Sequence, residues 1–241
     1  MKESPMHELA ARVAGLDWKQ IERELDTRGY ALTARILSPR ECAALIALYP
    51  EREKFRSRVE MARHRYGQGD YKYFAYPLPE EIAELRAALY KKLAPIANRW
   101  TREMGIAAEY PAGLKSFLAQ CHAHGQKRPT PLMLRYDAGG YNCLHQDLYG
   151  ELAFPLQFTC TLSERGRDFE GGELLLVEQR PRAQSRGEAI AASAGCGVIF
   201  ANRYRPAMGA RGHYRLNVRH GVSTLTRGER YALGIIFHDA K

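Results

Sequence analysis

The stretch LMLRYDAGGYNCLHQD, residues 132–147, decides the fold class of this chain. Its first part carries apolar side chains two residues apart, the spacing that places them on one face of a β-strand. A glycine pair at 139–140 then marks a turn. After the turn, His145 and Asp147 again lie two residues apart, so on a strand an imidazole and a carboxylate point to the same face. The stretch therefore predicts two strands, the second of which carries a pair of metal-ligand side chains.

The same alternation recurs through the second half of the chain. The sets that share a face are Leu132, Leu134 and Tyr136; Phe154, Leu156, Phe158, Cys160 and Leu162; and Tyr214, Leu216, Val218 and His220. The runs 174–177 and 197–200 are short and apolar, as expected of buried strands. Glycines or prolines separate these segments. Several short strands at such intervals predict a jelly-roll barrel or sandwich over residues 129–241.

The first half, residues 1–128, is predicted to be mainly helical. We expect helices at 17–27, ending at Gly29; at 39–49, after the capping signature of Ser38, Pro39 and Glu41; at 79–104, kinked at Pro95; and at 114–122. A strand is expected at 30–37. Residues 52–76, rich in Arg and Tyr, are expected to form a basic, aromatic loop or an irregular edge. The predicted fold class is α+β, with a helical N-terminal half packed on a β core.

The composition excludes several classes of protein. A chain of 241 residues with 45% hydrophobic and 26% charged residues can bury a core, which excludes a disordered or fibrous protein. No apolar run approaches the roughly 18–20 residues that cross a bilayer, so no membrane insertion is expected. The five cysteines are odd in number and form no C-x-x-C pair, which favours a reduced, cytoplasmic protein. The net charge of +9 fits either an anionic partner or a solubility requirement.

His145 and Asp147 need a third ligand to make a metal site. Two histidines and one carboxylate form the facial triad of non-haem Fe(II) enzymes, which leaves coordination positions open for a co-substrate and oxygen. The downstream candidates are His213, His220 and His238. His213 follows a glycine-bearing stretch that is typical of a turn, and His238 lies three residues from the end of the sequence.

His220 is the preferred third ligand. It ends the alternating run of residues 214–220, so it is expected to face the interior of the barrel with the apolar members of that run. Arg230 follows ten residues later and opens the last apolar strand, 231–237. From there its guanidinium can reach an anionic co-substrate bound at the metal.

These residues together resemble a known superfamily. An H-x-D pair, a distal His and a basic residue about one strand further on are the pattern of the Fe(II)/2-oxoglutarate-dependent dioxygenases. Tyr136, nine residues before His145, is placed like the 2-oxoglutarate-binding Tyr of prolyl-hydroxylase-like and alkylation-repair members. Residues 169–174 resemble the Gly-Gly-x-Leu strand entry of the superfamily. Residues 220–230 are similar to the His…Thr-Arg-Gly-x-Arg segment of the bacterial prolyl-hydroxylase-like group.

The resemblance implies a double-stranded β-helix core with Fe(II) as the metal and with 2-oxoglutarate and O2 as co-substrates. It implies that His145, Asp147 and His220 hold the iron. It also implies that Arg230 pairs with the far carboxylate of 2-oxoglutarate and that Tyr136 hydrogen-bonds to it. The implied reaction couples oxidative decarboxylation of 2-oxoglutarate to hydroxylation of a substrate C–H bond.

Three interpretations of the function remain open, two of them enzymatic. Oxidative dealkylation of damaged nucleic acid is favoured by the net charge and by residues 144–147, LHQD, which resemble the iron motif of the bacterial alkylation-repair oxygenase. Hydroxylation of a prolyl or other amino-acid side chain, or of a small molecule, agrees with the ten-residue spacing from His220 to Arg230. A non-catalytic, cupin-like binding module is the third. The side chains expected to contact a substrate from residues 52–76 are Arg63, His64, Tyr66, Tyr71 and Tyr73.

Overall fold

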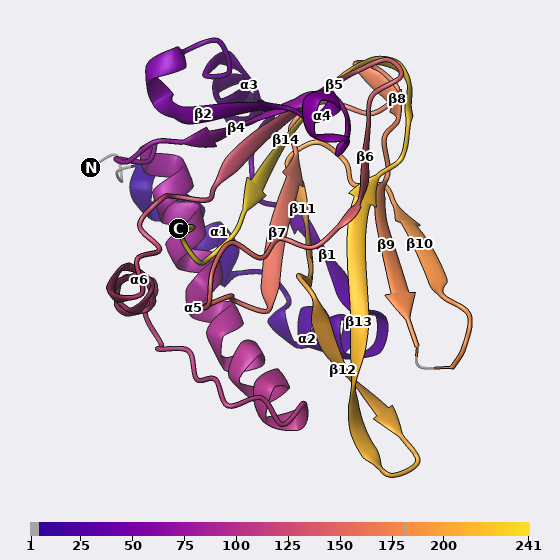
Figure 1. The fold of residues 1–241 in the computed structure, drawn as a ribbon. Helices are drawn as coiled ribbons and strands as arrows, with labels where there is room; N and C mark the ends of the chain where they lie inside the picture. Colours follow the sequence, from indigo (N-terminus) through magenta and orange to yellow (C-terminus); the bar gives the residue numbers. More distant parts are fainter. Residues whose placement is uncertain (1–4, 181) are drawn as a thin grey trace.

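Figure 1 shows the path of the chain in a computed structural model, which describes residues 5–180 and 182–241. The helices are α1 (Pro5–Ala14), α2 (Trp18–Arg28), α3 (Pro39–Ala47), α4 (Met61–His64), α5 (Glu80–Glu103) and α6 (Leu114–Ala123), with a 3-10 turn at Arg52–Lys54. The strands of the first half are β1 (Tyr30–Arg35), β2 (Phe55–Glu60), β3 (Gly67–Gln68) and β4 (Asp70–Phe74). The strands of the second half are β5 (Leu132–Asp137), β6 (Tyr141–His145), β7 (Leu156–Thr161), β8 (Phe169–Gly171), β9 (Leu174–Gln179), β10 (Arg186–Ile190), β11 (Cys196–Ala201), β12 (Tyr204–Gly209), β13 (Gly212–Val222) and β14 (Leu225–Ile235).

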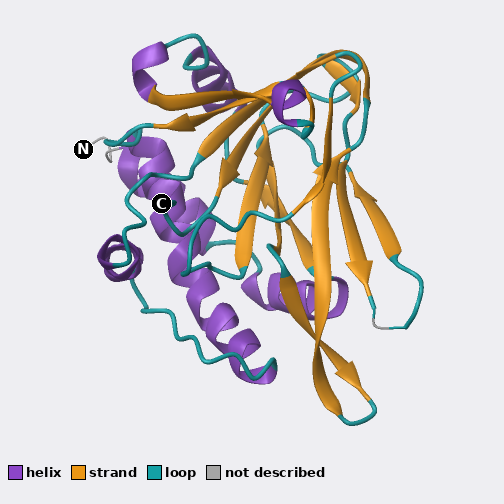
Figure 2. Cartoon of the chain, in the orientation of Figure 1, coloured by secondary structure: helices purple, strands orange, loops and turns teal. Residues whose placement is uncertain are grey.

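The strands form two antiparallel sheets. The large sheet has the order β1-β11-β7-β14-β5-β4-β2, with β8 beside β14. The small sheet has the order β10-β9-β13-β6-β3, with β12 beside β13. The small sheet lies on one side of the large sheet, and α1, α5 and α6 lie on the other (Figures 1 and 2). This confirms the predicted α+β class with a jelly-roll core and helices packed against it.

The helix ends follow the sequence signals closely. Ser38 accepts a hydrogen bond from the backbone N–H of Glu41, and the Glu41 carboxylate accepts one from the backbone N–H of Ser38, so the predicted capping box closes α3 at its start. Gly29 ends α2 in the left-handed conformation, with φ of 77°, and its N–H bonds to the carbonyl of Leu25. These ends place β1 directly after α2, where it pairs with β11 in the large sheet.

For residues 52–76, the structure has the second of the two expected forms, an irregular edge, and not a loop. They form a hairpin at the edge of the large sheet, in which β2 pairs with β4 and β4 pairs with β5. One of the arginines in this segment is neutralised by a carboxylate of the neighbouring strand: the Asp70 carboxylate accepts hydrogen bonds from Arg58 Nε at 2.8 Å and from the Tyr49 hydroxyl at 2.5 Å. Because Tyr73 and Phe74 at the end of β4 are both buried, the segment is a strand pair despite its composition. Both halves of the chain therefore contribute strands to one sheet.

Helix α5 spans residues 80–103 and continues through Pro95, where the sequence predicts a kink. Its buried face packs against an aromatic cluster in which the rings of Tyr90, Phe117 and Phe154 lie with centroids 5.1–5.9 Å apart. The other face of the helix is charged. Within the described ranges, no helix is both long enough and apolar enough to cross a membrane.

A buried ion pair ties α5 to the end of the chain after β14. Arg86 Nη2 lies 2.9 Å from Asp239 Oδ1, and both side chains are almost fully buried. Arg86 also donates to the carbonyls of Ile236 and Phe237, while the Tyr76 hydroxyl donates to Asp239. Because β14 leads into this segment, the pair fixes the strand that carries Arg230.

Replacing Arg86 with Met should destabilise the protein strongly. The substitution leaves the Asp239 carboxylate buried without its cation, which costs about 3–5 kcal/mol of unfolding free energy. Urea denaturation followed by circular dichroism measures the loss. Arg167→Met is the control, since Arg167 is exposed and pairs with Asp168 at the surface, so its loss should change the midpoint little. Equal midpoints for the two variants would contradict a structural role for the buried pair.

Candidate active site

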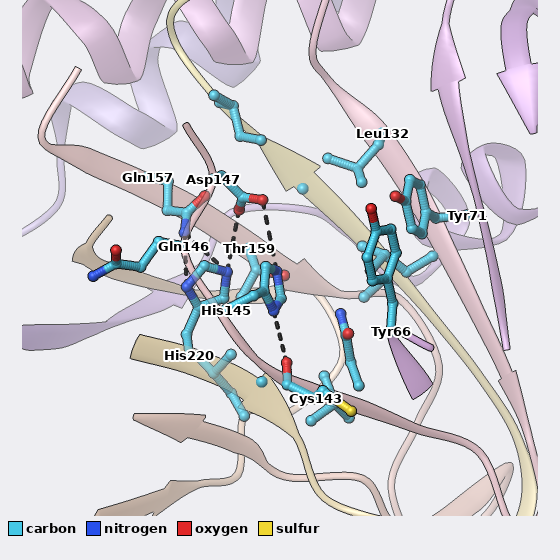
Figure 3. A pocket seen from close by; sticks show the side chains of 18 of the residues that line it. Tyr66, Tyr71, Leu132, Cys143, His145, Gln146, Asp147, Gln157, Thr159 and His220 are labelled. Atoms are coloured by element: carbon cyan, nitrogen blue, oxygen red, sulfur yellow. Dashed lines mark hydrogen bonds and ion pairs between the residues drawn. The ribbon is translucent and has the colours of Figure 1, made fainter. Parts of the chain in front are cut away.

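Two neighbouring strands of the small sheet bring the two predicted histidines together. His145 at the end of β6 lies directly opposite His220 on β13 in the strand register, and their ring centroids are 4.2 Å apart. His220 Nε2 lies 3.1 Å from Asp147 Oδ2, and His145 Nε2 lies 3.6 Å from Asp147 Oδ1. The ligand atoms of all three residues lie within 4.8 Å of one another. Figure 3 shows the three side chains converging on one side of a cavity.

Asp147 is positioned by side chains rather than by the pleat of a strand. The sequence predicts that His145 and Asp147 share a strand, but β6 ends at His145. Asn202 holds the backbone of Asp147 at both of its polar groups: Asp147 N–H donates to Asn202 Oδ1 at 3.0 Å, and Asn202 Nδ2 donates to the Asp147 carbonyl at 2.7 Å. The carboxylate accepts a hydrogen bond of 2.6 Å from the Tyr149 hydroxyl, which in turn lies 2.9 Å from the Tyr73 hydroxyl.

The protonation states suit metal binding. Nδ1 of His145 lies 2.8 Å from the Cys143 carbonyl, so this nitrogen carries the proton and Nε2 presents its lone pair to the cluster. Burial and the nearby His145 lower the pKa of His220, which favours the neutral imidazole. Burial opposes ionisation of Asp147, but the hydrogen bond to His220 and the two imidazoles outweigh it and hold the pKa of this carboxyl below its usual range.

This donor set fits Fe(II). Ligand atoms about 2 Å from an ion and at right angles to one another lie roughly 3 Å apart, close to the separations from Asp147 to the two histidines. Two imidazoles and one carboxylate on one side of the ion leave the remaining octahedral positions open. The cluster can therefore hold a metal and still accept further ligands from the cavity.

Arg230 lines the same cavity, and Tyr136 lies beside it in the wall behind the lining residues. They pair in register across β14 and β5, and Arg230 Cζ lies 5.8 Å from the centre of the Tyr136 ring. Both side chains are buried. Among the described residues, no carboxylate pairs with Arg230 and no group hydrogen-bonds to the Tyr136 hydroxyl. A cation and an unpartnered hydroxyl next to an open cavity are suited to an anionic ligand.

The glycine pair of the Phe-Glu-Gly-Gly segment makes room for Arg230. Gly172 has φ of +64°, and a Cβ added there would lie 2.3 Å from Leu225 Cδ1 and 3.1 Å from Arg230 Cδ. Any other residue would be strained in backbone and would press on the arginine stem. The resemblance noted for residues 169–174 therefore has a local cause, which is the close approach of this turn to β14.

The cavity has a volume of about 440 Å³ and is lined by both the metal-binding cluster and Arg230. Of the predicted substrate contacts, Tyr66, Tyr71 and Tyr73 line it, and Figure 3 shows Tyr66 and Tyr71 across the cavity from His145. Arg63 and His64 are not among the lining residues. Arg63 pairs with Glu60 at 2.5 Å in an exposed position, and His64 stacks on Tyr66 with ring centroids 5.3 Å apart.

Several functional side chains escape the sequence analysis. Tyr149, Gln157 and Asn202 surround the metal ligands, and the amide nitrogen of Gln157 lies 3.2 Å from Nε2 of His220. Tyr149 lies two residues beyond Asp147, in a segment with no strand, so strand periodicity gives no valid signal for it. Asn202 follows β11 and meets Asp147 only through the sheet topology, so no local signal indicates it.

Comparison with known proteins now decides the family. A family described as "Oxygenase, catalysing oxidative methylation of damaged DNA" matches residues 69–240, well over half of the chain. The chain belongs to this family. A Mycobacterium tuberculosis protein that is named only as uncharacterized is 54% identical to this oxygenase over 167 residues, which are 69% of this chain and 72% of that protein.

Solved structures share the fold of the oxygenase. A Pseudomonas putida prolyl-4-hydroxylase has a TM-score of 0.55 and 17% identity, covering 90% of this chain and 96% of its own. An oxidoreductase of the 2OG-Fe(II) oxygenase family from Burkholderia pseudomallei has a TM-score of 0.53 and 17% identity, covering 99% and 94%. The carbocyclase SnoK of nogalamycin biosynthesis has a TM-score of 0.55 and 16% identity, covering 93% and 85%. At these identities the likeness concerns the fold.

Family, fold and metal cluster agree on the class of enzyme. The oxygenase is an oxidoreductase with the fold of the 2-oxoglutarate-dependent dioxygenases, which confirms the predicted superfamily. The cluster of His145, Asp147 and His220 supports Fe(II) as its metal and 2-oxoglutarate as its co-substrate. Membership of an oxygenase family also disfavours the cupin-like binding module, because that interpretation has no catalytic activity.

Tyr149→Phe should weaken metal binding about 10- to 100-fold, the usual effect of removing a hydrogen bond to a metal ligand. Burial and the neighbouring Asp147 carboxylate raise the pKa of Tyr149, so the residue stays a hydroxyl donor that restrains this carboxylate. Titration calorimetry with Mn(II) in the absence of 2-oxoglutarate measures the affinity. Tyr66→Phe is the matched control, because Tyr66 lines the same cavity and its hydroxyl makes no hydrogen bond to a metal ligand. Equal affinities in the two variants would show that the Tyr149 hydroxyl does not position Asp147.

Proposed function

We propose that this oxygenase removes alkyl groups from damaged nucleobases by oxidising them. The observation that carries the proposal is the shared cavity, in which the metal-binding cluster faces a wall of tyrosines. The family description names damaged DNA as the substrate of related enzymes. Because an oxygenase inserts oxygen and does not transfer methyl groups, we take the chemistry to be oxidation of an alkyl group that the base already carries.

Different residues of the chain would bind the metal and the co-substrate in this reaction. His145, Asp147 and His220 would hold Fe(II) from one side, and Arg230 would bind the far carboxylate of 2-oxoglutarate while the Tyr136 hydroxyl donates to it. When bound, Fe(II) with 2-oxoglutarate and O2 supplies the oxidation of a substrate C–H bond, with succinate and CO2 as the co-products. An N-methyl group hydroxylated in this way leaves the base as formaldehyde.

The tyrosine wall supports a planar aromatic substrate. Tyr66 is half exposed at the cavity, while Tyr71 and Tyr73 lie deeper along β4. Stacking of a base on such rings is worth about 1–3 kcal/mol and tolerates any base, since every base has a π-face. The net charge of +9 supports an anionic polymer as the partner. We also propose a cytoplasmic location, which the five free cysteines support.

Hydroxylation of a prolyl or other amino-acid side chain is the second candidate. It is favoured by the ten-residue spacing from His220 to Arg230, which resembles that of the prolyl-hydroxylase-like group. The tyrosine wall can also contact a proline ring. The substrates therefore have to be compared directly.

Release of succinate and formaldehyde tests the proposed function. The wild-type protein with Fe(II), 2-oxoglutarate and an N-methylated oligonucleotide should form both products in equal amounts, and a proline-containing peptide should not stimulate succinate release. Asp147→Ala should abolish both products because it removes a metal ligand. Stimulation by the peptide alone would establish the second candidate in place of the first.

Arg230→Met should raise the KM for 2-oxoglutarate about 10- to 100-fold, because a charge-assisted hydrogen bond contributes about 1.5–3 kcal/mol. Initial rates of succinate formation over a range of 2-oxoglutarate concentrations give the value. Arg227→Met is the control on the same strand, since Arg227 pairs with Glu170 in an exposed position away from the cavity. An unchanged KM in the Arg230 variant would remove this residue from the co-substrate site.

A further inference from the structure

The outermost strand of the large sheet extends the tyrosine wall beyond the cavity. In the antiparallel register of β2 and β4, Ser57 lies opposite Tyr73 and Val59 lies opposite Tyr71. Residues directly opposite on such strands share a face of the sheet, and Tyr71 and Tyr73 line the cavity. Ser57 and Val59 are partly exposed. Together with Arg56 they form a ledge beside the cavity mouth, which we call the β2 ledge.

An irregularity in β2 turns Arg56 onto this face. The register between β2 and β4 shifts between Phe55 and Ser57, as at a β-bulge. The Arg56 guanidinium lies over the Tyr73 ring, with Cζ 4.4 Å from the ring centre. Its Nε donates to the Pro129 carbonyl at 2.9 Å, which leaves its two terminal nitrogens available to a ligand.

A second cation without a counter-charge lies next to Arg56. Arg128 is exposed one residue before Pro129. Burial lowers the pKa of Arg56 and the charge of Arg128 adds to this effect, while Tyr73 and the more distant Asp239 oppose it. Within the described part of the chain, neither arginine forms an ion pair. The contrast with Arg58 is direct: this residue of the same strand pairs with Asp70 at 2.8 Å. Two like charges left unpaired beside an aromatic wall favour an anion between them.

We propose that the β2 ledge and Arg128 bind the sugar–phosphate backbone of single-stranded nucleic acid next to the base held in the cavity. The inference rests on the proposed function and deepens it. A base must leave its stack to reach a metal cluster between two sheets, which is easiest in a single strand. Cations interleaved with aromatic side chains are typical of surfaces that bind single strands. Arg65, exposed and lining the cavity on the Tyr66 side, provides a cation at another part of the mouth.

The test uses a double variant, Arg56→Ala with Arg128→Ala, and a matched control, Arg23→Ala with Arg102→Ala. Arg23 on α2 and Arg102 on α5 are exposed, so the control loses the same charge outside the ledge. Fluorescence anisotropy with a labelled single-stranded oligonucleotide of about ten nucleotides, over a range of salt concentrations, gives the affinity. Equal thermal midpoints show that the variants are folded.

The double variant should bind the oligonucleotide about tenfold more weakly at low salt than the control variant does. The slope of log affinity against log salt should fall by about 1.4, since each phosphate contact to a single strand contributes roughly 0.7. The wild-type preference for a methylated oligonucleotide over the methylated nucleoside, measured as a ratio of kcat/KM, should shrink by a similar factor. Affinity and slope equal to those of the control would overturn the inference.

The outcomes separate this inference from the proposed function. If neither the methylated nucleoside nor the methylated oligonucleotide is oxidised, the proposed function fails and the ledge inference falls with it. If the oligonucleotide is oxidised but the double variant matches the control, only the ledge inference fails. An acidic peptide of the same charge serves as a competitor. Equally strong competition by that peptide would identify a general anion site and overturn the assignment to nucleic acid.

Discussion

His145 and His220 face each other because β6 and β13 are neighbours and these two residues pair directly, just before the register shifts toward Val222, and the rest of the site depends on that pairing. A slip of one residue would turn His220 to the outer face of the small sheet, since side chains alternate along a strand. The register of β13 is held on its other side by β9, where Leu176 lies opposite His220. Backbone pairing on both sides of one long strand thus fixes the two histidines, while Asn202 and Tyr149 hold Asp147 against them.

The direction of His220 and the core could be predicted because both follow strand periodicity, whereas Asp147 lies beyond the end of β6, so the strand argument that paired it with His145 does not hold. The alternation of residues 214–220 indicates that His220 points into the core. Only one turn separates Tyr136 from His145, so their spacing can be read from the sequence. The contact between Asn202 and Asp147 could not be predicted, because it joins segments that only the sheet order brings together. The composition of residues 52–76 gave no indication of the hairpin of β2 and β4, because arginines and tyrosines in such numbers are typical of a loop. In the structure, Arg58 bonds to Asp70, and β4 pairs with the neighbouring strand β5.

That hairpin connects the chemistry with the surface around it. Its inner strand, β4, supplies Tyr71 and Tyr73 to the cavity, and Tyr73 reaches Asp147 through the Tyr149 hydroxyl. Its outer strand, β2, continues the same face outward and carries Arg56 over Tyr73. One supersecondary unit therefore extends from a metal ligand to the cavity mouth, so a molecule bound on the outer strand would rest against the hydrogen-bond chain that restrains the metal ligand.

The three buried arginines show how the fold treats charge. Arg86 pairs with Asp239 and Arg205 pairs with Glu178, and both pairs join elements of the scaffold. Arg230 is as deeply buried as Arg205, yet it forms no ion pair with a carboxylate of the described residues, and the charge of Glu173 acts on it only from a distance. An unpaired charge in such a place costs several kcal/mol, and the Tyr136 hydroxyl beside it is unpartnered as well. The fold neutralises its structural arginines but not this one, and Arg230 lines the metal cavity. This contrast supports our proposal that the partner of Arg230 is an anionic ligand that also reaches the metal.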